Sequence, residues 1–173
     1  MKVLGIAGWS GSGKTTLVTK LLPLLVARGL RVSTVKHAHH DFDIDQPGKD
    51  SWRHRQAGAS EVLISSARRF ALIHEHGGDA ELGLQQILAR MSPADIVLVE
   101  GFKRERHPKI EVWRPAVGKP LLAADDPHII AVTTDSPRQE LPNKLDVPVL
   151  DLNDVQAVAE FVVGRSMALA ELR

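Results

Sequence analysis

The stretch Gly8-Trp9-Ser10-Gly11-Ser12-Gly13-Lys14-Thr15 constrains this chain more than any other feature of its sequence. It matches the phosphate-binding loop pattern G-x-x-x-x-G-K-[ST] at every fixed position. Its glycines permit the positive φ angles of such a loop, and they remove the Cβ atoms that would keep backbone N–H groups from a nucleotide's phosphates. We therefore predict that residues 8–16 contain these nucleotide contacts: Gly8, Ser10, Gly11, Ser12, Gly13, Lys14, Thr15 and Thr16.

Two side chains of the loop have separate predicted roles. Lys14 brings a compact positive charge to the β- and γ-phosphates and is a predicted catalytic residue, and the hydroxyl of Thr15 is the predicted inner ligand of Mg²⁺. Residues 3–7 read as a buried strand, and leucines at helical spacing follow Lys14 until Gly29. A helix that begins at the loop points the positive end of its dipole at the phosphates. This context disfavours the alternative, a Gly/Ser-rich turn that binds nothing.

Strands and helices alternate along the rest of the chain. Apolar or alternating runs predict strands at residues 30–36, 96–99, 109–113, 129–132 and 147–150. Helical spacing and stop signals predict helices at 50–57, at 79–91 and after Asn153 or Asp154. The strand-like runs 61–65 and 70–75 flank a polar turn and predict a hairpin. Together these elements predict the α/β class: a three-layer P-loop NTPase fold with a mostly parallel sheet and an added hairpin, built as a single nucleotide-binding domain over residues 1–173.

Composition excludes several classes of protein. A net charge of +1 provides no broad basic field, so nucleic acid is not an expected partner. Without cysteine the chain can form neither disulfides nor thiolate metal sites, which fits a reducing compartment. The first predicted strand and the glycine loop follow the start of the sequence at once, which leaves no room for a signal peptide, and no apolar run approaches membrane-spanning length. We therefore expect a cytoplasmic protein that does not contact membranes.

Four functional side chains lie at or just beyond the carboxyl ends of predicted parallel strands, where α/β proteins bind their ligands: Lys14, Asp41, Glu100 and Asp135. Glu100 follows four apolar residues, as the second metal-site acid of phosphate-loop proteins does. We predict that it holds Mg²⁺ or one of its waters. The alternative is an acid that ends a strand and faces solvent.

The polar segment after residue 36 offers a further contact to a metal or a water through Asp41, Asp43 and Asp45. Asp41 is preferred as a catalytic and metal-binding residue because it lies nearest the strand end. Histidines at positions 37, 39 and 40 accompany these acids, but they lack a spaced partner pair. A solvated polar loop is therefore favoured over a zinc site.

Asp135 is the predicted reader of the nucleotide base. A carboxylate can accept hydrogen bonds from guanine N1–H and from the N2 amino group, which adenine cannot reproduce. The residues before it are Thr133-Thr134 and not the Asn-Lys-x of most GTPases, so the prediction depends on one residue and its position. The alternative is an aspartate that forms a turn before Ser136-Pro137.

Several segments together resemble the molybdopterin-guanine dinucleotide biosynthesis adapter family, the protein B (MobB) family of that pathway. The resemblance covers most of the chain, and the segments that carry it are 8–16, 35–41, 45–51, 56–59, 98–103 and 132–135. Among these, the histidine–aspartate stretch that leads into Pro47-Gly48-Lys49-Asp50 is far more specific than the phosphate loop.

This resemblance implies a homodimer that binds GTP, hydrolyses it weakly with Mg²⁺, and assists molybdopterin guanylyltransferase, the enzyme that joins GMP to molybdopterin. It also implies that the strands leading into the phosphate loop and into Glu100 are neighbours. Two other functions stay open. A small-molecule kinase would need an arginine-rich lid, for which residues 104–106 and 68–69 are the candidates. A carrier of a pterin or metal cofactor would bind nucleotide only incidentally.

Overall fold

The main sheet of this computed structural model has seven strands, and the structure describes residues 1–38, 42–137, 141 and 145–172. The strands run in the spatial order β2-β5-β1-β6-β7-β8, and every pair along this path is parallel. The short β9 is antiparallel to the start of β1. Their bounds are β1 (Lys2–Ala7), β2 (Val32–Lys36), β5 (Ile96–Glu100), β6 (Lys109–Val112), β7 (Ile129–Thr134), β8 (Val149–Asp151) and β9 (Met167–Ala168). The predicted mostly parallel α/β sheet is confirmed.

Two helices cover one face of this sheet, α1 (Lys14–Ala27) and α4 (Val155–Arg165). Leu21 and Leu25 of α1 and Val162 of α4 are completely buried against alternate side chains of the central strands. Each fully buried leucine contributes about 1.5–3 kcal/mol of hydrophobic free energy. The carboxylate of Asp154 accepts a hydrogen bond from the Ala157 N–H at 3.0 Å, so α4 begins at the predicted cap.

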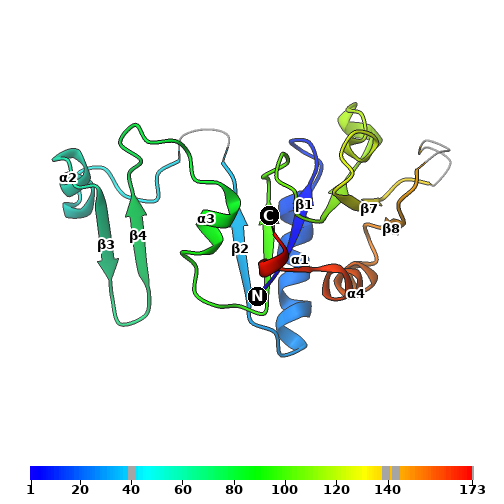
Figure 1. Ribbon diagram of the computed structural model, residues 1–173, viewed down its shortest axis with the longest axis horizontal. Coiled ribbons are helices and arrows are strands. Elements are labelled where there is room, and N and C mark those ends of the chain that lie inside the picture. Colours follow the sequence, from blue (N-terminus) through cyan, green and yellow to red (C-terminus); the bar gives the residue numbers. More distant parts are fainter. Residues whose placement is uncertain (39–41, 138–140, 142–144, 173) are drawn as a thin grey trace. The chain divides into compact units, whose positions relative to one another are not determined.

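Residues Ala38–Ile87 form a compact unit of their own, and Met1–His37 with Leu88–Arg173 form the other. The smaller unit contains α2 (Asp50–Gln56) and the antiparallel hairpin of β3 (Glu61–Ser65) and β4 (Phe70–His74) (Figure 1). The Ser66 N–H donates to the Arg69 carbonyl at 2.9 Å and closes the turn between them. The predicted hairpin and short helix are confirmed, whereas a single domain over residues 1–173 stays a prediction.

One predicted helix is wrong in length. The helical pattern over residues 79–91 is realised only as α3 (Leu84–Leu88). The Gly83 carbonyl accepts the Ile87 N–H at 3.1 Å, and the Gly83 N–H donates to the side chain of Gln86 at 3.0 Å. Glycine is unfavourable inside a helix but common at its first boundary, so the helix starts after Gly83. Short 3₁₀ turns complete the described elements: η1 (Pro115–Val117), η2 (Leu122–Ala124) and η4 (Leu169–Glu171).

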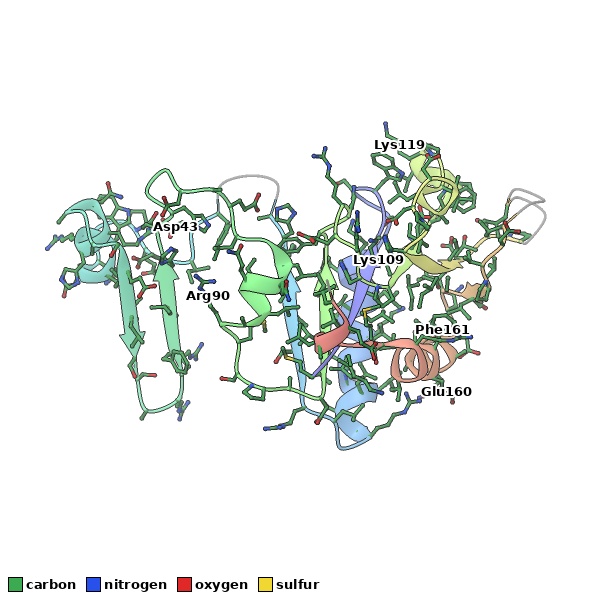
Figure 2. The ribbon with its side chains drawn as sticks, in the orientation of Figure 1. Asp43, Arg90, Lys109, Lys119, Glu160 and Phe161 are labelled. Atoms are coloured by element: carbon green, nitrogen blue, oxygen red, sulfur yellow. The ribbon has the colours of Figure 1, made fainter. Side chains whose placement is uncertain are left out.

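The central strand β6 buries charged side chains on the sheet face opposite α1 and α4. Lys109 (labelled in Figure 2) is fully buried. Its Nζ lies 3.1 Å from Asp126 Oδ2. The carboxylate of Glu111 accepts the N–H groups of Leu122 and Ala123, each at 2.9 Å. The alternating sequence of this strand suggests one solvated face, but these partners let the charges be buried instead. Within the described part of the chain, no helix is long and apolar enough to cross a membrane.

Candidate nucleotide-binding site

The glycine loop runs from the end of β1 to the start of α1, so the predicted order of strand, loop and helix is confirmed. Gly8, Gly11 and Gly13 have φ angles of 140°, 79° and 99°, a range in which other residues are strained. A Cβ atom at Gly8 would also lie 2.5 Å from the Val112 carbonyl oxygen. The Ser12 hydroxyl is buried and has no hydrogen-bond partner among the described residues. The loop therefore has the backbone shape of a phosphate cradle and one polar side chain with unused hydrogen-bonding capacity.

Lys14 starts α1 and is only partly buried. Its Nζ donates to the Trp9 carbonyl at 2.9 Å, which holds the ammonium against the loop. Burial lowers the pKa of Lys14, the charge of Glu100 opposes this shift, and the nearby Lys103 and Lys36 add to it. Several cations thus surround the loop, and a bound phosphate would relieve their repulsion.

Thr15 and Glu100 are in direct contact, although 85 positions separate them in the sequence. The Thr15 hydroxyl donates to Glu100 Oε1 at 2.8 Å. The contact follows from the sheet, because β1 and β5 are parallel neighbours and Ile6 is the register partner of Glu100. The adjacency of these two strands, which the family resemblance implied, is confirmed. Ser10 and Thr16 are exposed residues of the loop and of the first turn of α1.

The chain after Glu100 follows a strained path. Gly101 has a φ of 98°, and a Cβ atom there would lie 2.7 Å from the Cβ of His37. Phe102 has a φ of 47°, which costs a bulky residue conformational energy, and its ring stacks on His37 with 4.5 Å between centroids. This turn places the Lys103 ammonium 4.7 Å from the centre of the Trp9 ring. The end of β5 and the turn after it therefore contact the phosphate loop and the start of α1 at two points, through Glu100 and through Lys103.

The structure places Asp135 beside an arginine that the sequence did not single out. Arg114 Nε lies 3.1 Å from Asp135 Oδ2, and the two side chains are 38% and 34% exposed. Arg114 follows β6 and Asp135 follows β7, at equivalent positions beyond the register pair Val112 and Thr133. The one available signal was that Arg114 directly follows a strand-like run, as the predicted site acids do.

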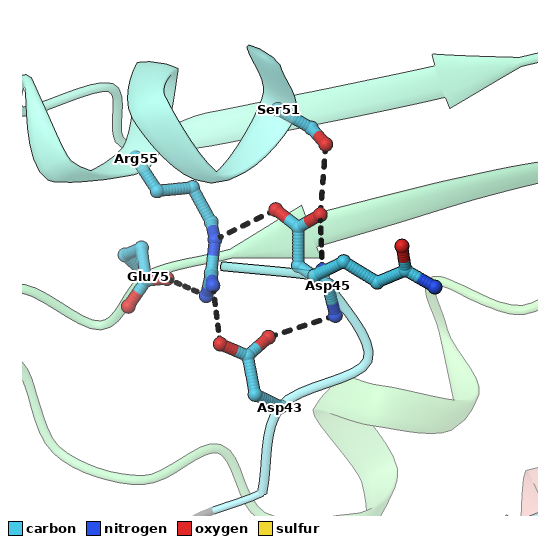
Figure 3. A network of polar contacts seen from close by, with 6 residues as sticks. Asp43, Asp45, Ser51, Arg55 and Glu75 are labelled. Carbon is cyan, nitrogen blue, oxygen red and sulfur yellow. Dashed lines mark hydrogen bonds and ion pairs between the residues drawn. The ribbon is translucent and has the colours of Figure 1, made fainter. Parts of the chain in front are cut away.

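The acids of the segment after β2 divide into two groups. Asp41, with His39 and His40, lies outside the described residues, so its predicted catalytic and metal-binding roles stay predictions. Asp43 and Asp45 lie 2.6 Å and 3.4 Å from the guanidinium of Arg55, which also pairs with Glu75 at 2.8 Å (Figure 3). A hydrogen bond from the Asp45 N–H and the pairing with Arg55 lower the pKa of Asp43.

The Asp45 carboxylate also accepts the Ser51 hydroxyl at 2.8 Å, so both acids join the chain to α2. No group of three or more His, Asp or Glu side chains within the described ranges has a geometry that could hold a metal. The carboxylates of Asp43 and Asp45 therefore pair with Arg55 inside the smaller unit.

Comparison with known proteins identifies the family to which this chain belongs. The family model for "Molybdopterin guanine dinucleotide synthesis protein B" (MobB) matches residues 3–135. This chain belongs to the MobB family. It is 48% identical over 164 residues to the molybdopterin-guanine dinucleotide biosynthesis adapter protein of Escherichia coli (strain K12), covering 93% of this chain and 91% of that protein.

Other members of the MobB family are similar to this chain in sequence and in structure. The Haemophilus influenzae adapter protein is 42% identical over 92% of this chain and 86% of its own length. The crystal structure of a MobB homologue from Bacillus stearothermophilus superposes with a TM-score of 0.69 at 28% identity, covering 95% of this chain and 97% of that one. The fold is thus the P-loop NTPase fold of MobB proteins. The span matched by the family model includes the phosphate loop, Glu100, Arg114 and Asp135.

Proposed function

We propose that this chain is a GTP-binding adapter in molybdopterin guanine dinucleotide biosynthesis, with slow, Mg²⁺-dependent GTP hydrolysis. The contact between Thr15 Oγ1 and Glu100 Oε1, beside a glycine loop of matching backbone shape, is the observation that carries the nucleotide part. A hydroxyl and a carboxylate are the hard oxygen donors that Mg²⁺ prefers. The E. coli and H. influenzae relatives, both molybdopterin-guanine dinucleotide biosynthesis adapter proteins, support the pathway.

Each residue of the proposed site has one task. The loop N–H groups and Lys14 bind the phosphates, Thr15 and Glu100 hold Mg²⁺, and Asp135 reads guanine. When bound, Mg²⁺ neutralises charge on the phosphate oxygens. Asp41 is the proposed residue that orients the attacking water, because of the three aspartates in this segment it lies nearest to the end of the preceding strand in the sequence.

The proposed partners are molybdopterin guanylyltransferase and a second copy of this chain. A homodimer is supported by the hairpin of the smaller unit. Leu63, Phe70 and Leu72 share one face of it, because Leu63 pairs with Leu72 and Ser65 with Phe70. They are 59%, 69% and 50% exposed, and a patch of large apolar side chains on a two-stranded sheet is typical of a protein interface.

Calorimetric titration with GTP and magnesium tests the nucleotide site. The Lys14→Ala variant is expected to lose most of the affinity, by about tenfold or more, because a hydrogen bond to a charged group is worth roughly 1.5–3 kcal/mol. Lys2→Ala is the matched control, since Lys2 is exposed at the opposite end of β1. Removal of magnesium is expected to weaken binding to the wild type. Equal affinity of Lys14→Ala and Lys2→Ala would show that the loop is not the nucleotide site.

A further inference from the structure

Arg114 has a position that links the two halves of the candidate site. Its Nε lies 3.1 Å from the Asp135 carboxylate. On its other side, a Cβ atom placed on Gly13 would lie 3.8 Å from Arg114 Cζ and 3.9 Å from Nη2. Gly13 is the residue from which α1 begins. One guanidinium therefore lies between the predicted base reader and the N-terminus of the phosphate-loop helix.

One donor of this guanidinium, Nε, makes no hydrogen bond within the described part of the chain. This Nε is buried and lies close to Asp135, so the pair is held by charge alone. A guanidinium has five donors in a planar fork that fits phosphate oxygens, and it remains charged at every accessible pH. An ion pair with a single contact between partly exposed side chains contributes little stability, so this contact is poorly explained as a structural bridge.

Arg114 also lies close to the phosphate loop and to the first turns of α1. With Gly13 and Thr16 it lines a small pocket whose other walls are Leu17, Lys20, Leu152 and Asn153. Asp135 keeps its acceptor capacity beside the ion pair, because each carboxylate oxygen carries two lone pairs. The pairing therefore leaves the carboxylate free to accept two hydrogen bonds from a base.

We propose that Arg114 is a nucleotide ligand that determines specificity: its guanidinium donates to the phosphate nearest Gly13 and orients the Asp135 carboxylate toward guanine. This inference rests on the proposed GTP binding. It makes Asp135 dependent on Arg114, so that the phosphate and base ends of the nucleotide are recognised through one ion pair. A nucleotide whose base cannot donate hydrogen bonds to Asp135 forms only the contact between its phosphate and Arg114.

Titrations of GTP and ATP into Arg114→Gln, Asp135→Asn and the double variant test this proposal. Arg114→Gln keeps the polar side chain and removes the charge. We expect it to lower GTP affinity about tenfold or more and ATP affinity by a smaller factor, so that the GTP/ATP ratio falls. Asp135→Asn is expected to lower GTP affinity similarly and to leave ATP affinity nearly unchanged. In the double variant the loss of GTP affinity should be clearly smaller than the product of the two single losses.

Arg31→Gln is the control, because Arg31, just before β2, also pairs with an aspartate, Asp95, through Nε and Oδ2 at 4.0 Å, although these side chains are more exposed (74% and 47%). Circular dichroism and thermal unfolding confirm that each variant is folded. If Arg114→Gln binds GTP as Arg31→Gln does, or if its effects are equal for GTP and ATP and multiply with those of Asp135→Asn, the proposal is overturned while GTP binding stands. Failure of the wild-type chain to bind GTP would overturn the proposed function and this inference together.

Discussion

His107 lies two residues before β6, and its burial is expected to make the stability of the fold depend on pH. It is completely buried, and neither ring nitrogen has a hydrogen-bond partner in the described part of the chain. Burial, together with the charge of Lys109 and against that of Asp126, lowers the pKa of His107 from its ordinary 6.5 to about 4. The folded chain therefore holds a neutral imidazole at a pH where the unfolded chain is already protonated.

Acidification is therefore expected to destabilise the folded chain relative to the unfolded chain. The stabilising contribution of His107 is complete above pH 6.5 and is lost as the pH falls from 6.5 through 4, by roughly 3 kcal/mol in total. We predict that urea unfolding at pH 7.5 and 4.5 shows a larger loss of stability for the wild type than for His107→Leu. Burial raises the pKa of Glu111, which acts in the opposite direction, but that contribution is common to both proteins. An identical pH dependence in both would contradict the prediction.

At the scale of elements, the hairpin of β3 and β4 has an exposed apolar face. Val62 on the other face is 8% exposed, whereas Leu63 and Phe70 are well exposed. We predict that Leu63→Lys with Phe70→Lys weakens the proposed dimer strongly, because two charges would have to be desolvated in the interface. Sedimentation equilibrium measures the dissociation constant. Val26→Lys is the control, since Val26 of α1 is 57% exposed in the other unit. A double variant as dimeric as this control would show that the hairpin is not the interface.

At the scale of the whole molecule, the rate of hydrolysis separates an adapter from a kinase. A GTPase without an arginine finger turns over on the order of 10⁻⁴ to 10⁻² s⁻¹, whereas kinases reach roughly 1–100 s⁻¹. Asp135 already neutralises part of the charge of Arg114, the arginine beside Gly13. We predict slow phosphate release with magnesium from the protein alone, and a change in rate or affinity when molybdopterin guanylyltransferase is added. Fast phosphoryl transfer to a small hydroxyl compound in the absence of any partner would instead support a kinase.

The phosphate loop, the alternation of strands and helices, and the hairpin could be predicted from sequence because their causes are local. Glycines at positions 8, 11 and 13 are required by positive φ angles within the loop itself. The apolar run 96–99 is buried on both sides whatever its neighbours are. The error over residues 79–91 has a local cause as well, because apolar spacing was given more weight than the helix boundary at Gly83.

Only the tertiary structure decided which of these predicted residues meet. The parallel pairing of β1 with β5 brings Thr15 to Glu100, and the register of β6 on β7 brings Arg114 to Asp135. Strand order and register depend on the simultaneous packing of side chains that are distant in the sequence, and no single segment contains that information. The sequence by itself therefore determined that a phosphate-binding loop begins an α/β sheet. The fold determined that an arginine beyond the end of β6 lies between that loop and the aspartate proposed to read the base.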